Sequence, residues 1–459
     1  MEKLLRNGNK IHFTSLGCSR NLVDTEILLG LVLKSGYEVT GNEEQADYLV
    51  INTCGFLESA RQEALDTLEE LFALKKPEAK VIVAGCMVQK HSQILKETFP
   101  QIHYMLGPGD LEKILEALAS SETGEEITSA RSYLQWGEIP RQLATPKHYA
   151  YLKIAEGCAK RCSFCIIPTI KGPLKSKPQE QVIHEFKSLL AQGVHEIILI
   201  AQDLGDYGRE RKEKGALEKL LREMLKVEGE YWIRLLYLYP DEVTDELVDV
   251  INSDPRLLPY LDMPIQHINS AILKGMRRKT NREHIIKTYE LLRTRIPECV
   301  IRTSLMVGFP GETDEQFQEL VSFIREYPLD NVGVFTFSPE EGAQAAKLPG
   351  QLPETIKQGR YETLMQTQME IIVARNRGYV GKTLEVMVES VHPESEFLLQ
   401  GRFYGQCPDM DGQVIINDAR AVESLGQLHE VEITDVIDYD LIGTAIAPKK
   451  KLSPLNVIT

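Results

Sequence analysis

The sequence lacks any run of eighteen apolar residues, which excludes an ordinary membrane-spanning helix. Its first ten residues, MEKLLRNGNK, also lack the apolar stretch of a secretory signal. Basic residues are in deficit, because 52 Lys and Arg stand against 67 Asp and Glu and leave a formal charge of −15. Broad binding to a nucleic-acid backbone needs the opposite balance. We therefore expect a cytoplasmic protein with no membrane partner, for which nucleic acid is not the main partner.

The length of 459 residues predicts two or three domains, and 43% hydrophobic residues are enough to give each a core. In the first part of the chain, β-rich segments alternate with helical ones, which predicts an open parallel α/β sheet. The expected strands lie at 11–16, 48–53, 80–84 and 103–106. We assign residues 8–125 to this N-terminal domain and residues 126–147, which include IPRQLATPKH, to a linker.

The alternation returns over residues 148–378, the second predicted domain. Six strand candidates are each followed by a helical pattern, which predicts a partial (βα)6 TIM-type barrel. These candidates lie at 150–155, 196–201, 232–238, 260–265, 300–307 and 331–337. Residues 379–446 instead hold short alternating strands with Gly and Pro at the turns, which predicts a small antiparallel β-barrel.

Three of the eight cysteines, Cys158, Cys162 and Cys165, stand within the motif GCAKRCSFCIIP. Thiolate is the soft ligand that iron–sulfur clusters require. A structural zinc site would need a fourth protein ligand, and the motif offers no further Cys or His. Three ligands leave one iron of a [4Fe–4S] cluster open to a chelating cofactor. The motif also follows the first barrel strand, at the rim where active sites of such barrels lie.

Three other cysteines, Cys18, Cys54 and Cys86, each follow a predicted strand, in FTSLGC, VINTC and VIVAGC. Loops that follow the strands of a parallel sheet share one edge, so these thiols should converge in space. Each also precedes a helix, whose N-terminus favours a thiolate. We predict a second three-thiolate cluster here. Cys299 and Cys407 have no partner at ligand spacing and are expected to be inert.

The CxxxCxxC motif at the start of a partial barrel resembles the radical S-adenosylmethionine (SAM) superfamily. Together with the N-terminal triplet and the C-terminal β-domain, it makes the chain similar to the methylthiotransferase family. This resemblance implies two [4Fe–4S] clusters and SAM, with a TRAM domain at the C-terminus. It also implies that one SAM methylates a sulfur at the cluster of the N-terminal triplet and that another, cleaved at the cluster of the central triplet, yields the 5′-deoxyadenosyl radical. An electron donor protein and a sulfur source are implied partners.

Two branches of that family modify different substrates. The segments SLGCSRNLVDTE, LIAQDLGDYG, YLDMPIQH and RTSLMVGFPGET resemble the branch that adds a methylthio group to an aspartate β-carbon in the twelfth small-subunit ribosomal protein. The alternative branch modifies an isopentenylated adenosine in transfer RNA and more typically has GCQMN at the first cysteine. An alternative of another class is a non-catalytic iron–sulfur factor in ribosome assembly.

Polar residues at the ends of barrel strands are candidates for SAM contacts, because that rim carries the active site. We expect Gln202, Gln266 and Arg302 to contact SAM. We expect no catalytic residue beyond the ligands of the two clusters. The predicted C-terminal domain has three basic and thirteen acidic residues, a net charge of −10. Such a surface would attract a basic ribosomal protein, although an ordinary solvated acidic surface is the alternative.

Overall fold

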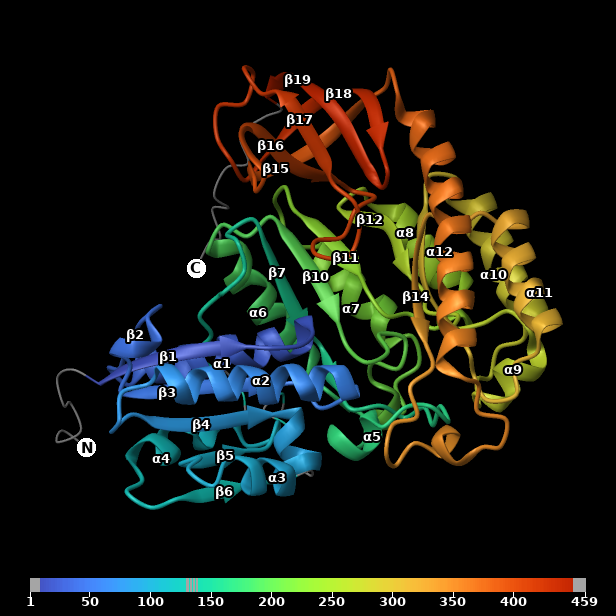
Figure 1. The fold of residues 1–459 in the computed structure, drawn as a ribbon. Helices are drawn as coiled ribbons and strands as arrows, with labels where there is room; N and C mark the ends of the chain where they lie inside the picture. Colours follow the sequence, from blue (N-terminus) through green and yellow to red (C-terminus); the bar gives the residue numbers. More distant parts are fainter. Residues whose placement is uncertain (1–8, 129–131, 133, 135–136, 138, 449–459) are drawn as a thin grey trace.

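The computed structural model describes residues 9–448 except 129–131, 133, 135, 136 and 138. It has three parts, an N-terminal parallel sheet, a central parallel sheet and a C-terminal β-barrel, as predicted (Figure 1). Within the described part of the chain, we find no helix with the length and apolar character needed to cross a membrane.

The N-terminal sheet has six parallel strands in the order β2-β1-β3-β4-β5-β6. Successive residues of a strand point to opposite faces, so Leu49 and Ile51 pack with α2 and α3 while Val50 packs with α1 and α4. Burial on both faces explains the continuous apolar strands. The strands are β1 (Lys10–Ser15), β2 (Glu38–Val39), β3 (Tyr48–Thr53), β4 (Lys80–Gly85), β5 (Tyr104–Leu106) and β6 (Gly124–Glu126), and the helices are α1 (Ser19–Lys34), α2 (Glu58–Leu74), α3 (Cys86–Thr98) and α4 (Ile114–Ala119).

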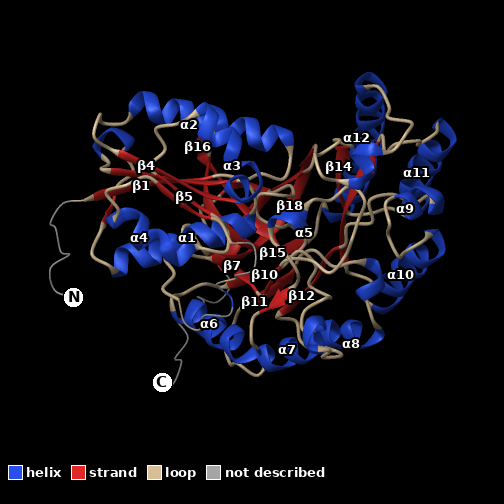
Figure 2. Ribbon diagram, turned by 90° about the horizontal axis from the view of Figure 1, so that it is seen from below, coloured by secondary structure: helices blue, strands red, loops and turns tan. Residues whose placement is uncertain are grey.

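The central sheet contains all six predicted strands, parallel and in the order β14-β13-β12-β11-β10-β7. They are β7 (Tyr149–Lys153), β10 (Glu196–Ile200), β11 (Trp232–Leu235), β12 (Leu257–Asp262), β13 (Val300–Val307) and β14 (Asn331–Thr336). Helices cover the outer face (Figure 2): α6 (Gln179–Ala191), α7 (Ala216–Leu225), α8 (Asp245–Ser253), α10 (Arg282–Arg295), α11 (Asp314–Glu326) and α12 (Glu354–Asn376). Because β7 and β14 are not paired, the barrel is open on one side.

Helix α1 of the N-terminal part packs against the inner face of this open barrel. Its apolar residues Val23 and Ile27 belong to one buried cluster with Tyr151 and Ile198 of β7 and β10. The N-terminal sheet therefore lies beside the open edge of the barrel (Figure 1). This packing brings the strand ends of the two sheets toward each other.

The C-terminal barrel is closed, in the order β15-β16-β17-β19-β18. Its strands are β15 (Thr383–His392), β16 (Ser395–Phe403), β17 (Val414–Asp418), β18 (Gln427–Ile437) and β19 (Asp440–Pro448). Strand β17 pairs with β19 in parallel, whereas the other four pairings are antiparallel. The barrel is therefore mixed, which corrects the expectation of a purely antiparallel one.

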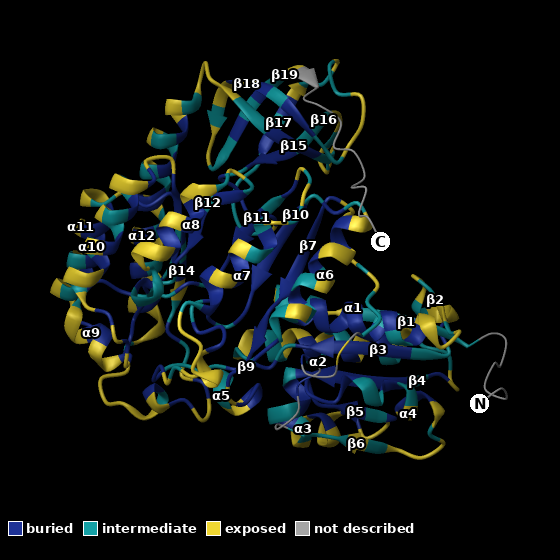
Figure 3. Ribbon diagram, turned by 180° about the vertical axis from the view of Figure 1, so that it is seen from behind, coloured by how far each residue is buried: buried dark blue, intermediate teal, exposed yellow. Residues whose placement is uncertain are grey.

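The loop between β16 and β17 fills the end of the central barrel where its strands begin. Cys407 is fully buried in the cluster that includes Tyr151 and Tyr260. The Asp411 carboxylate accepts a hydrogen bond of 2.6 Å from the Tyr260 hydroxyl and forms an ion pair of 3.3 Å with Arg302. The central cysteines follow the opposite end of β7, so the C-terminal domain covers the end of the barrel that lies away from them. The strands of the central sheet that run between these two ends are buried (Figure 3).

A buried ion-pair network holds this domain in place, and we predict that it is essential to docking. Glu196, at the start of β10, accepts hydrogen bonds of 2.6 Å from Arg234 and 2.7 Å from Arg402, and all three side chains are buried. Burial by itself raises the pKa of Glu196, but the two guanidinium groups lower it to about 2, so it is charged. Glu196→Gln should cost about 3–5 kcal/mol, because the buried Arg234 loses its counter-charge, whereas Arg402 keeps its ion pair with Glu389.

Thermal unfolding and limited proteolysis of the 379–446 region would measure this loss. The exposed Glu432→Gln change in β18 is the matched control and should leave both unchanged. Equal melting temperatures for the Glu196 and Glu432 variants would contradict the docking role.

Candidate active site between the two cysteine triplets

Three loops at the strand ends of the N-terminal sheet bring Cys18, Cys54 and Cys86 together. A Cβ atom added to Gly17 would lie 2.7 Å from Cβ of Cys54, and one added to Gly55 would lie 2.9 Å from the carbonyl carbon of Cys86. Gly17 also has φ +90°, which favours glycine. The loops are thus in direct contact, and none of the three thiols is in a disulfide.

Two cations face this triplet. Lys171, which follows the central cysteine motif, pairs with Asp24 of α1 at 3.0 Å and with Glu156 at 2.8 Å. Burial raises the pKa of Cys86 to about 12, and Lys171 opposes that rise. Burial also acts to raise the pKa of Cys18, but Arg20 outweighs it together with the backbone N–H of Asn21, so that the pKa is lowered. Burial also raises the pKa of Cys54, so the nearby cations favour the thiolate, the form that binds a metal, at Cys18 alone of the three.

The central triplet lies in the loop that follows β7. Backbone N–H groups of Lys160 and Ile167 donate to the sulfurs of Cys158 and Cys165, each over 3.4 Å. The hydroxyl of Tyr239 lies 3.5 Å from Sγ of Cys162. Hydrogen bonds to the sulfurs are one way in which proteins tune an iron–sulfur cluster.

Lys160, between the first two cysteines of the motif, anchors the loop to the barrel rim. Its ammonium group lies 3.3 Å from Asp203, 3.6 Å from Asp241 and 3.7 Å from Asp206, and it also donates to Glu242. Burial raises the pKa of Asp203 to about 7 against the opposing charge of Lys160. These acids form a cage around an ammonium group, so they do not offer a vacant metal site. Sequence reasoning missed Lys160, although a cation inside the motif was a visible signal.

Both parts of the chain line one cavity of about 840 Å³. All three central cysteines and Arg20 of the N-terminal part line it. Two of the three expected SAM contacts, Gln202 and Gln266, line it as well, and the buried Oε1 atom of Gln202 has no hydrogen-bond partner in the structure. Arg302 is placed differently, because it pairs with Asp262 at 3.0 Å and with Asp411 in the barrel interior.

The cysteines fit a multi-iron cluster better than a single ion. Tetrahedral zinc, with Zn–S bonds of about 2.3 Å, would hold its sulfurs about 3.8 Å apart. Among the described residues, the only group of three potential ligands within 4.8 Å of one another is Asp203, Asp206 and Glu242, so neither triplet is gathered for one ion. Three free thiols around a wider space suit a [4Fe–4S] cluster with one iron left open.

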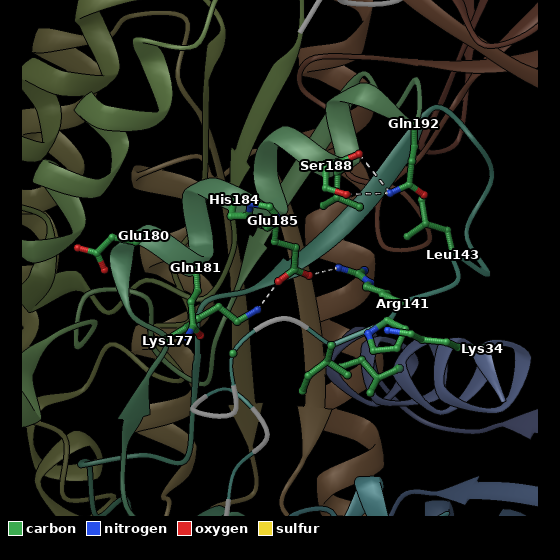
Figure 4. Close-up of a pocket in the computed structure, with 15 residues that line it drawn as sticks. Lys34, Arg141, Leu143, Lys177, Glu180, Gln181, His184, Glu185, Ser188 and Gln192 are labelled. Atoms are coloured by element: carbon green, nitrogen blue, oxygen red, sulfur yellow. Dashed lines mark hydrogen bonds and ion pairs between the residues drawn. The ribbon is translucent and has the colours of Figure 1, made fainter. Parts of the chain in front are cut away.

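A second cavity, of about 610 Å³, lies between α1 and α6, and polar side chains predominate at its wall (Figure 4). Glu185 of α6 stands between Arg141 and Lys177, and Arg141 also binds Glu26 of α1 at 2.6 Å. Because Arg141 forms ion pairs with Glu26 of α1 and Glu185 of α6, this cluster holds α1 against the central barrel.

The fold and the cysteine loop define a radical SAM protein, and the comparisons agree. Residues 152–324 match the model of the Radical SAM superfamily, residues 10–107 that of "Uncharacterized protein family UPF0004", and residues 380–446 that of the TRAM domain. A radical SAM protein uses a [4Fe–4S] cluster and SAM.

Curated relatives specify the family further. The chain is 60% identical to "Ribosomal protein uS12 methylthiotransferase RimO" of Protochlamydia amoebophila, over 96% of this chain and 93% of that protein. Proteins of the same name are 56% identical in Chlamydia abortus (95% of each chain) and 43% identical in Bdellovibrio bacteriovorus (97% of this chain, 99% of that one). The chain belongs to the RimO family of radical SAM methylthiotransferases.

Among solved structures, the radical SAM methyltransferase TsrM of Kitasatospora setae, with cobalamin and a [4Fe–4S] cluster bound, has a TM-score of 0.54 at 18% identity. The likeness covers 72% of this chain and 75% of that one. It concerns the fold alone.

Proposed function

We propose that this protein adds a methylthio group to the β-carbon of an aspartate in ribosomal protein uS12, the twelfth protein of the small subunit. The observation that carries the proposal is the cavity of about 840 Å³ that is lined by the central triplet and by Arg20 and Phe56, which follow Cys18 and Cys54 by two residues each. A methylthio transfer needs a carbon radical and a sulfur donor at one place. Family membership supports the substrate, since the relatives are named for uS12.

In this proposal Cys158, Cys162 and Cys165 hold one [4Fe–4S] cluster and Cys18, Cys54 and Cys86 hold a second. When bound, the first cluster and SAM supply the radical that takes hydrogen from an unactivated carbon, a reaction beyond the reach of protein side chains. An electron donor protein and a sulfur source are the further partners that this chemistry requires.

In this proposal, the remaining residues of the cavity bind and orient SAM and the substrate. Gln202 and Gln266 offer amide groups to SAM, and the hydroxyl of Tyr239 is within hydrogen-bond distance of the sulfur of Cys162. Phe164 and Phe337 are among the apolar side chains of the wall, which limits water around a reactive radical. The expected SAM contact of Arg302 stays a prediction. Its ion pairs with Asp262 and Asp411 favour a structural role, in which Arg302 joins the central barrel to the loop between β16 and β17.

Intact-mass analysis of purified uS12 tests the substrate. After incubation with reconstituted enzyme, SAM and a reductant, uS12 should gain the mass of one methylthio group. If an isopentenylated adenosine of transfer RNA gained this mass instead of uS12, the chain would belong to the other branch. Absence of 5′-deoxyadenosine with all substrates would favour the non-catalytic assembly factor.

The acidic C-terminal domain is a further candidate contact with the basic substrate. Three of its thirteen acids are engaged elsewhere, because Glu389, Asp409 and Asp411 bind residues of the central barrel. The others, such as Glu432 and Asp435, leave an acidic outer surface. A summed charge of this sign can steer a basic partner over about 8 Å at physiological salt.

Iron content tests the second cluster. We expect about eight irons per chain after anaerobic reconstitution, because each triplet can hold a four-iron cluster. A plateau near four, with Cys18, Cys54 and Cys86 all open to alkylation, would remove the N-terminal cluster. Chemical iron analysis with mass mapping of alkylated cysteines distinguishes the two results.

A further inference from the structure

Arg20 is a cation that reaches from the N-terminal part into the central cavity. It is the second residue of α1, and its Nη1 atom donates over 2.8 Å to the carbonyl of Ala201, just beyond β10. Its guanidinium carbon lies 4.6 Å from the ring centre of Tyr237. Arg20 therefore lies on the wall of the cavity that the central triplet lines, two residues after Cys18.

Helix stability does not account for this residue. The N-terminus of a helix carries a partial positive charge, so an arginine there is unfavourable. Nor does an ion pair account for it: among the described residues, no carboxylate lies within ion-pair distance of Arg20, whereas Arg141, the other arginine that joins α1 to the barrel, binds Glu26 and Glu185. The side chain of Arg20 is half-buried, and of its five N–H donors one bonds the carbonyl of Ala201 and another bonds the sulfur of Cys18, so donors remain for a further anion.

Arg20 lies near both triplets in the fold. It follows Cys18 by two residues, and it lines the same cavity as the three central cysteines. Its hydrogen bond to Ala201 holds the guanidinium group at the rim of the central barrel. A group bound to its remaining N–H donors in that cavity would therefore lie close to both triplets.

We infer that Arg20 binds the carboxylate of the target aspartate and so positions its β-carbon between the two triplets. This inference rests on the proposed function. The β-carbon is bonded directly to the carboxylate carbon, so anchoring the two oxygens fixes the reacting atom. A guanidinium group binds a carboxylate with two parallel hydrogen bonds, which sets orientation as well as position. A neutral adenine needs no such group.

Binding of two peptides to the reconstituted full-length protein with SAM present tests this role. One peptide carries the uS12 segment with its target aspartate, and the other has asparagine there. Arg20→Met should weaken binding of the aspartyl peptide on the order of 10- to 100-fold, as expected for a charge-assisted hydrogen bond. The asparaginyl peptide should bind the parent and the variant equally. Arg20→Lys keeps the positive charge but loses the pair of parallel hydrogen bonds, so it should restore part of the preference for the aspartyl peptide over the asparaginyl peptide.

Arg141→Met is the matched control, because it makes the same change at the same interface but outside the cavity. It should preserve the preference for the aspartyl peptide even if it lowers stability. If Arg20→Met weakened the binding of both peptides equally, the inference would be overturned and Arg20 would be assigned to the interface. If Arg20→Met lost iron from the N-terminal triplet, the inference would likewise be overturned and Arg20 would be assigned to the cluster. A parent protein that does not methylthiolate the aspartyl peptide would overturn the proposed function itself, and with it the ligand of Arg20.

Discussion

Replacing Cys162 by alanine is expected to abolish formation of 5′-deoxyadenosine from SAM. Cys162 is a buried residue of the loop that Lys160 anchors to the barrel rim. Loss of one thiolate from three leaves two ligands for four irons, and the cluster that delivers the electron should not form. The N-terminal triplet lies on another sheet, so about four irons per chain should remain. Chromatography of the SAM products and iron analysis measure both effects.

Cys299→Ala is the matched control for that variant. Cys299 is fully buried in the core of the central barrel and lies in neither triplet. The change removes one sulfur and costs packing, but it should leave SAM cleavage in place. Continued cleavage by the Cys162 variant at the parent rate would show that Cys162 is not a ligand of the cluster.

Replacing Cys54 by alanine is expected to have the converse effect. Cys54 follows β3, and its loop contacts Gly17 next to Cys18. We expect SAM still to be cleaved, because the central triplet and its hydrogen bonds are untouched, but no methylthio product to appear. Iron should again fall to about four per chain. Mass analysis of uS12 and assay of 5′-deoxyadenosine on the same sample separate the two activities.

The two cysteine variants together test the division of labour between the triplets. If both lost SAM cleavage to the same extent while remaining folded, one triplet could not be assigned to the radical and the other to sulfur. If the Cys54 variant still formed the methylthio product, the N-terminal triplet would have no part in the reaction.

Most strands were predictable because their apolar segments are long and bounded by turns. Strand β19 has a weak local signal at Gly443 and Ala445, and it is stabilised by pairing with β17 and β18. The short strands β2 and β6 add only two and three residues to the edges of the N-terminal sheet, which local sequence does not reveal.

The polar residues of the site were harder to place. Gln202 and Gln266 line the cavity as expected, whereas Arg302 pairs with Asp262 of the neighbouring strand. Alternation along a strand predicts two faces but does not say which polar group finds a partner across the barrel. Arg20 and Lys171 were missed as site residues for the same reason, since their neighbours are far away in the sequence.

The sequence by itself determined the chemistry of the two cysteine triplets. The spacing of Cys158, Cys162 and Cys165 is local, and the edge shared by Cys18, Cys54 and Cys86 follows from the rule that loops after parallel strands lie together. Only the tertiary structure decided that the central triplet shares one cavity with Arg20 and Phe56, which follow Cys18 and Cys54 by two residues each. That arrangement depends on α1 packing in the open barrel and on buried pairs such as Asp24 with Lys171 and Glu26 with Arg141. Such contacts join residues more than a hundred positions apart, and no local pattern encodes them.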